Sequence, residues 1–147
     1  MEKVLAQLNI ATALAPLESE QLKEFVDNLD RINGIAEQSP GFIWRLKDDS
    51  GNATNISYFD NPNTIINMSL WESIGALKHF MFMTDHLAIM KQKAKWFEKP
   101  NKATYVLWWV DKGHIPTIDE ALTRLALLQE SGDTPQAFSF KKPYPAN

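Results

Sequence analysis

The chain has 147 residues, 44% of them apolar, which suits a single soluble domain with a real hydrophobic core. Its net charge of −3 and its lack of cysteine argue against a nucleic-acid partner and exclude disulfides and thiolate metal sites. No apolar run approaches the roughly 18 residues of a membrane span, and no signal peptide is recognisable, so we expect a cytoplasmic protein without a membrane partner.

The first third of the chain alternates strands with one long helix. Alternating apolar residues predict a strand over residues 3–11. Apolar residues at helical spacing then predict an amphipathic helix that begins near Ser19 and ends at the Ser-Pro-Gly of residues 39–41. A second strand is expected over residues 42–47, and the Asp-, Asn- and Gly-rich stretch 48–63 predicts a long loop.

The middle of the chain repeats this alternation. Residues 65–71 predict a third strand, and Ser73 is placed to cap the helix that follows it. Helical spacing continues from a second cap at Thr84 to about Glu98. Residues 105–110 predict a fourth strand that is apolar on both faces, as expected for a central or doubly covered strand.

The last helix has the clearest boundaries. Thr117 and Glu120 form a capping box directly after Pro116, and Gly132 is placed to end the helix. The tail, residues 134–147, is expected to pack on the domain or on a partner subunit. The whole of residues 1–147 therefore reads as one domain.

The order of strands and helices predicts a fold. Two strand–helix–strand halves sharing one sheet form a ferredoxin-like α+β domain, a four-stranded antiparallel sheet with helices on one face. Trp108 and Trp109 must point to opposite faces, so the helix-free face would expose aromatic side chains to water. Covering that face with a second copy removes this exposure, which predicts a homodimer.

Several short stretches carry a resemblance to a known family. They are residues 5–9, 41–46, 67–73, His86 with 91–98, 107–110, 113–117 and 134–140. The chain resembles the family of domain of unknown function 3291, a relative of the antibiotic-biosynthesis-monooxygenase group in the dimeric α+β barrel superfamily. The resemblance implies a dimeric α+β barrel, and it carries no catalytic motif that transfers residue by residue.

Four polar residues occupy alternate positions in the first and third strands. Strand parity places Gln7 and Asn9 on one face, and Asn67 and Ser69 on one face together with Trp71. If the apolar sides of these strands meet the helices, the polar side chains line the other face of the sheet. A buried polar cluster must be hydrogen-bonded, so we expect either a ligand pocket or a satisfied network across the dimer.

Aromatic residues and one arginine complete this predicted pocket. Trp71 and Trp108 are its expected walls, although tryptophans more often serve a core or an interface. Arg45 would hold a carboxylate or enolate in bidentate fashion if it faces the barrel lumen. A surface salt bridge is the alternative for Arg45.

The resemblance implies a proton-handling role for His86, the candidate catalytic residue, and the near-neutral pKa of histidine suits this role without deciding it. The resemblance also makes it a candidate haem ligand, and the plainer interpretation is a role in capping the helix or in packing. His114 is expected to shape a strand-to-helix turn, and His79 to face solvent. The spacing of the histidines gives no metal signature, so no cofactor is expected apart from the haem alternative.

Three functional hypotheses remain open from the sequence. The first is a cofactor-independent monooxygenase-like or isomerase-like enzyme acting on a small apolar substrate. In it Asn9, Asn67 and Arg45 would polarise substrate oxygens and His86 would move a proton. The second is a non-catalytic dimer that binds a small hydrophobic molecule in the same pocket. The third is a structural dimer whose barrel lumen is filled with side chains.

Overall fold

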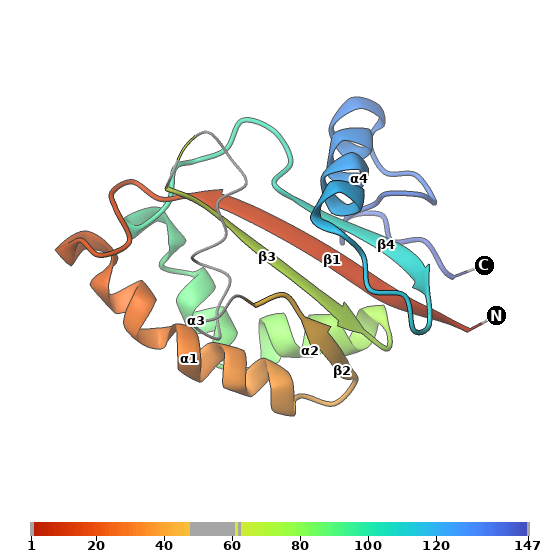
Figure 1. Cartoon of the computed structure of the whole chain (residues 1–147), viewed down its shortest axis with the longest axis horizontal. Helices are drawn as coiled ribbons and strands as arrows, with labels where there is room; N and C mark the ends of the chain where they lie inside the picture. The colour runs from red at the N-terminus through yellow and green to blue at the C-terminus, as the bar shows by residue number, and fades with distance from the viewer. Residues whose placement is uncertain (1, 48–60, 62, 147) are drawn as a thin grey trace.

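The computed structural model (Figure 1) describes residues 2–47, 61 and 63–146. The loop expected over residues 48–63 therefore lies mostly outside the described residues. Within the described part of the chain, no helix is both long and apolar enough to cross a membrane.

The centre of the molecule is a four-stranded antiparallel sheet in the order β2-β3-β1-β4. Its strands are β1 (Lys3–Thr12), β2 (Phe42–Arg45), β3 (Thr64–Trp71) and β4 (Tyr105–Asp111). The two longest strands, β1 and β3, lie side by side in the middle (Figure 1). This order confirms the predicted ferredoxin-like sheet.

Two helices cover one face of the sheet, which we call the α1/α2 face. They are α1 (Lys23–Gln38), which follows the short 3₁₀ helix η1 (Glu20–Leu22), and α2 (Ile74–Met83). Ser73 caps α2 as predicted, since its hydroxyl accepts a hydrogen bond from the Ala76 amide at 3.1 Å. The core on this face joins Leu5 and Trp71 of the sheet to side chains of both helices.

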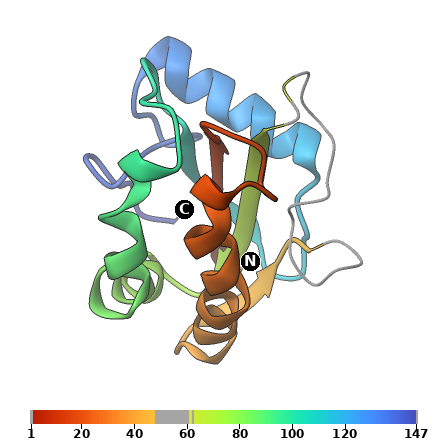
Figure 2. The ribbon, with the colours of Figure 1, turned by 90° about the vertical axis from the view of Figure 1, so that its left-hand side faces the viewer.

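The last helix, α4 (Ile118–Ser131), lies on the opposite face, which we call the α4 face (Figure 2). Its predicted cap is confirmed, because the Thr117 hydroxyl accepts the Glu120 amide at 3.1 Å. Leu125 and Leu128 pack against β1 and β4. The prediction that helices cover one face only is therefore wrong, because the apolar stripe of α4 is buried on the other side of the sheet.

The helix predicted from Thr84 to about Glu98 is also wrong in extent. The structure has a single-turn α3 (His86–Met90) and a short 3₁₀ helix, η2 (Lys93–Lys95). The backbone after η2 turns back to pair with the chain just beyond β1, where Ala13 and Phe97 form an antiparallel bridge. Helical spacing of apolar residues therefore continues in the sequence beyond the point where tertiary pairing ends the helix.

The C-terminal tail runs along the outer edge of β4. Leu107 and Phe138 exchange two backbone hydrogen bonds of 2.8 and 2.9 Å, and the Phe138 side chain is fully buried in the core of the α1/α2 face. The indole nitrogen of Trp109 donates to the Tyr144 carbonyl at 2.8 Å. In this structure the tail is thus part of the same subunit's core.

Candidate functional site

The predicted polar residues lie together on the two central strands. Cross-strand pairing places Gln7 opposite Ser69 and Asn9 opposite Asn67. All four share the parity of Leu5, whose side chain belongs to the core under α1 and α2. The condition that the apolar sides of β1 and β3 meet these helices is not fulfilled, so the cluster lies on the α1/α2 face and does not line the face opposite these helices. Those apolar sides pack under α4 instead.

A hydrogen-bonded network ties the cluster together. The Nε2 atom of Gln7 donates to Asn67 Oδ1 at 2.6 Å and to Ser69 Oγ at 2.8 Å. The indole nitrogen of Trp71 also donates to Ser69 Oγ at 2.8 Å. Every bond of this network lies within one subunit.

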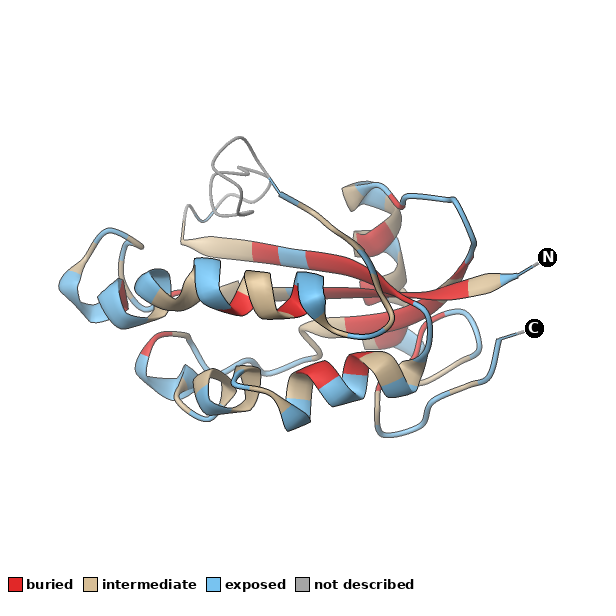
Figure 3. Ribbon diagram, turned by 90° about the horizontal axis from the view of Figure 1, so that it is seen from below, coloured by how far each residue is buried: buried red, intermediate tan, exposed pale blue. Residues whose placement is uncertain are grey.

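The cluster runs from the interior to the surface. Gln7 is 8% exposed and Ser69 6%, whereas Asn9 and Asn67 are exposed. Figure 3 shows this change as a pale-blue segment of a central strand between two red ones. The Asn9 and Asn67 side chains are thus accessible to solvent although they lie on the face that also carries α1 and α2.

Arg45 lies beside the cluster and already has an acidic partner. It pairs with Ser69 in the β2–β3 register, and its Nε donates to Glu37 Oε2 of α1 at 3.1 Å. The Arg45 side chain is only 11% exposed. The salt-bridge alternative for Arg45 is therefore confirmed, whereas the position facing a barrel lumen is not, because Arg45 lies on the α1/α2 face with the polar cluster.

His86 is connected to the cluster through stacked rings. Trp71 stacks on Phe80 at 5.3 Å between ring centroids, and Phe80 contacts the His86 ring at 4.8 Å. His86 Nδ1 lies 3.2 Å from the Met81 carbonyl, which can only accept, so Nδ1 carries the hydrogen of the neutral ring. No described residue hydrogen-bonds to Nε2. Burial lowers the pKa of His86, partly offset by this bond to Met81, so the ring favours the neutral, proton-accepting form.

The two predicted walls of the pocket, Trp71 and Trp108, lie on opposite faces of the sheet, so that part of the prediction is wrong. Trp71 pairs with Leu5 and Trp108 with Ala6, and successive residues of one strand point to opposite faces. Both rings are fully buried. The tryptophan that shares the face of Trp71 is Trp109, which pairs with Leu5 from the other side. Only the register between the strands decides whether Trp108 or Trp109 shares the face of Trp71, and this register cannot be read from the sequence.

Trp108 belongs to a separate set of contacts near the start of α4. Its indole nitrogen donates to one carboxylate oxygen of Glu120 at 3.1 Å, and His114 Nε2 lies 2.7 Å from the other. Gly113, with a φ of 95°, makes the turn before His114. These contacts anchor α4 to β4 and agree with the structural role expected for His114.

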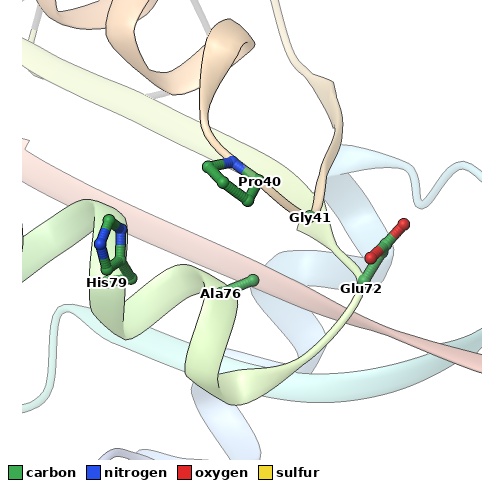
Figure 4. Close-up of a pocket in the computed structure, with 5 residues that line it drawn as sticks. All are labelled: Pro40, Gly41, Glu72, Ala76 and His79. Carbon is green, nitrogen blue, oxygen red and sulfur yellow. The ribbon is translucent and has the colours of Figure 1, made fainter.

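A shallow hollow lies on the α1/α2 face where the start of β2 approaches α2 (Figure 4). It measures about 250 Å³ and is lined by Pro40, Gly41, Glu72, Ala76 and His79. His79 is exposed, as predicted. A Cβ atom on Gly41 would lie 2.5 Å from that of Ala76, so this glycine lets the start of β2 approach α2. Neither the polar cluster nor His86 contributes to the hollow.

In the part of the chain that the structure describes, no three histidine, aspartate or glutamate side chains converge on a point where a metal ion could be held. The polar cluster consists of amides and a hydroxyl. These neutral groups bind and polarise ligand oxygens, and they are weaker metal ligands than carboxylates or imidazoles. The groups of the cluster can both donate and accept hydrogen bonds.

The sheet order and the two strand–helix–strand halves define an α+β domain of the ferredoxin-like class. The chain belongs to the family described as domain of unknown function (DUF3291), whose model matches residues 4–147. A comparison with curated proteins finds none that matches significantly.

Solved structures that resemble this chain do so at low sequence identity. SnoaB, a cofactor-independent oxygenase from Streptomyces nogalater, has a TM-score of 0.51 and 13% identity, covering 80% of this chain and 100% of its own. A protein of unknown function from Nitrosomonas europaea has a TM-score of 0.50 and 14% identity, covering 79% and 97%. A dabb family protein with a ferredoxin-like fold from Mesorhizobium loti has a TM-score of 0.43 and 15% identity, covering 78% and 98%.

Proposed function

We propose that this protein is a cofactor-independent, monooxygenase-like enzyme acting on a small, flat, apolar substrate that carries a polarisable oxygen. The observation that carries the proposal is the pair of exposed amides, Asn9 and Asn67, on central strands of an otherwise helix-covered face. SnoaB, an oxygenase that needs no cofactor, has the same fold, which supports this reaction class.

His86 is the proposed proton acceptor. Its Nδ1 hydrogen is held by the Met81 carbonyl, and its Nε2 lone pair is not engaged by any described residue. A neutral imidazole in this state can remove a proton from the substrate. The electron pair left behind delocalises onto the substrate oxygen as an enolate or phenolate, which the amides stabilise by hydrogen bonds.

Dioxygen is the proposed oxidant, and the overall reaction balances without a further reagent. An activated CH₂ group loses two hydrogens and becomes a carbonyl, taking one oxygen atom of O₂. The other oxygen atom leaves as water with those two hydrogens. Arg45 would add positive charge beside Ser69 as negative charge develops on the substrate oxygen.

The test is oxygen uptake with a panel of flat phenols, anthrones and cyclic 1,3-dicarbonyl compounds. His86→Ala should abolish oxygen uptake while leaving binding nearly intact, because only the proton acceptor is lost. His79→Ala, on an exposed position of α2, is the matched control and should keep full activity. Ligand binding by the wild type without oxygen uptake for any compound would favour the non-catalytic binding protein instead.

The haem alternative has a separate test. His86 Nε2 is also the atom that would ligate haem iron. We expect freshly purified protein to show no Soret band and to keep its oxygen uptake after exposure to a chelating resin. A Soret band that disappears in His86→Ala would replace the cofactor-independent proposal with haem binding.

We also propose that two copies associate through the α4 face. On this face Ile10, Trp44 and Leu46 are only partly buried although they adjoin the core. Among the described residues α4 packs against β1 and β4, and we propose the β2–β3 half of the face for the partner. The proposed ligand site lies on the other face, so each subunit would carry a complete site.

A further inference from the structure

The hydrogen bonds of Ser69 leave its proton without an acceptor. A serine hydroxyl has two lone pairs and one hydrogen to donate. Both lone pairs are occupied, one by Gln7 Nε2 and one by Trp71 Nε1, each at 2.8 Å. Both of these nitrogens can only donate, so the Ser69 hydrogen must point elsewhere. No described residue accepts it, although Ser69 is only 6% exposed.

The orientation of Asn67 is determined by the same glutamine. Asn67 Oδ1 accepts from Gln7 Nε2 at 2.6 Å. The Nδ2 group of Asn67, with two hydrogens, therefore occupies the other branch of its amide. No described residue accepts from Nδ2, and Asn67 is exposed. Asn67 Oδ1 and Ser69 Oγ lie close together on β3, because both accept from the same nitrogen of Gln7.

From this arrangement we propose that Gln7 is a positioning residue that turns Asn67 and Ser69 into a pair of hydrogen-bond donors for one anionic ligand oxygen. The preferred ligand is a phenolate or enolate. The inference rests on the proposed function, to which it adds the charge state of the bound substrate. Gln7 would act through its two neighbours, by giving both hydrogens of Nε2 to their oxygens.

The groups around Asn67 and Ser69 are compatible with an anionic ligand oxygen bound to these two residues. Gln7 Oε1 and the Asn9 amide are neutral, and Arg45 next to Ser69 is a cation paired with Glu37. Donors that bind the charged form of a phenol favour ionisation and lower its pKa. If the network only stabilises the fold, no preference for phenolate over phenol is expected.

Two variants of Gln7 separate hydrogen-bond direction from packing. Gln7→Glu keeps the shape but replaces the Nε2 donor by an oxygen, so the Ser69 hydroxyl and Asn67 Nδ2 would turn to donate to the new carboxylate. Gln7→Met keeps the approximate length and removes both polar atoms without adding charge. Gln136→Glu, at an exposed position of the tail, is the charge-matched control.

The probe is 4-nitrophenol, whose ionisation is read directly from its absorbance while bound. In the wild type we expect the pKa of the bound probe to fall by about one unit, a tenfold preference for phenolate. In Gln7→Met the preference for bound phenolate over bound phenol should decrease several-fold. In Gln7→Glu the pKa of the bound probe should rise above its solution value, with nitrophenolate affinity at least tenfold weaker. Gln136→Glu should match the wild type.

Several results would overturn the proposal. They are no binding of nitrophenol to the wild type at millimolar concentration, an unshifted pKa of the bound probe, or an unchanged preference in Gln7→Glu. If circular dichroism shows that Gln7→Glu does not fold, Gln7→Met decides alone, and wild-type phenolate preference in that variant refutes the role of Gln7.

Failure of the proposed function would look different. Without oxygenase activity, no compound would give oxygen uptake, while the nitrophenol titrations would still show the donor pair. Conversely, oxygen uptake that depends on His86 but is unchanged in Gln7→Glu would retain the enzyme and reject Gln7 as a positioning residue.

Discussion

At the scale of single residues, Ser69 is the point where the polar cluster and the aromatic core meet. Its hydroxyl oxygen accepts from Gln7 on the neighbouring strand and from the indole of Trp71 on its own strand. Trp71 in turn stacks on Phe80, next to His86. One small side chain therefore holds in place groups that belong to both parts of the proposed site.

Replacing Ser69 by alanine removes only one oxygen atom but should clearly lower the free energy of unfolding. The variant leaves the buried Trp71 indole N–H without an acceptor, and a buried unsatisfied donor costs about 1–3 kcal/mol. Urea unfolding should show this loss for Ser69→Ala, whereas Ser131→Ala, at the exposed end of α4, should change stability by less than about 0.5 kcal/mol. Equal stability of the two variants would mean that the network contributes little to folding.

His86 should make stability depend on pH in a defined direction. Burial lowers the pKa of the folded His86 below its ordinary value of 6.5, so near and below that pH the unfolded chain binds a proton more readily. Protonation then favours unfolding, and the free energy of unfolding should fall as the pH drops below 6.5. Urea titrations on either side of this pH, compared with His86→Gln, test it. The pH dependence should be weaker in the variant, and an identical dependence would assign it to other groups.

At the scale of elements, the C-terminal tail contributes to the core although none of its described residues lies in a helix or a strand. Phe138 bridges the edge of β4 and is fully buried among residues of α1, α2 and the sheet. The tail begins after α4 on one face and continues past the edge of β4 to the other. It thereby links the two layers of helices across the sheet.

Truncating Phe138 should therefore destabilise the whole domain. Phe138→Ala removes a fully buried ring, for which the expected loss is about 3–5 kcal/mol of unfolding free energy. Phe82→Ala removes a ring that is 37% exposed and lies against Phe140 of the tail, so its effect should be clearly smaller. Thermal and urea unfolding of the two variants provide the measurement. A small loss for Phe138→Ala would show that the tail is not a fixed part of the core.

At the scale of the whole molecule, the two faces of the sheet have different roles. The α1/α2 face carries the polar cluster, the ring stack and His86. The α4 face is apolar, with Leu8, Met68 and Trp108 all buried. We assign ligand chemistry to the first face and self-association to the uncovered part of the second.

The dimer proposal can be tested by charge insertion. Analytical ultracentrifugation at micromolar concentration should show a dimer for the wild type. Leu46→Arg should shift it to a monomer, because a charge would enter an apolar interface. Met83→Arg, at an exposed position of α2 on the opposite side, should remain dimeric. A monomeric wild type would remove the dimer but not the ligand site, which lies within one subunit.

Much of the fold could be predicted from sequence because its signals are local. The Thr117 cap, the Ser73 cap and the alternation in β1 and β3 depend on residues a few positions apart. Strand parity alone also placed Gln7 with Asn9, and Asn67 with Ser69, on one face of their own strand. These features were therefore predictable without knowing what packs against them.

Only the tertiary structure decided which helices cover which face. Parity relates residues within one strand, but the choice between Trp108 and Trp109 as the partner of Trp71 depends on the register between separate strands. The placement of α4 opposite α1 and α2, and the early end of α3, result from packing between segments far apart in the chain. Such long-range contacts leave no periodic signal in the sequence, because their energy comes from surfaces that meet only after folding.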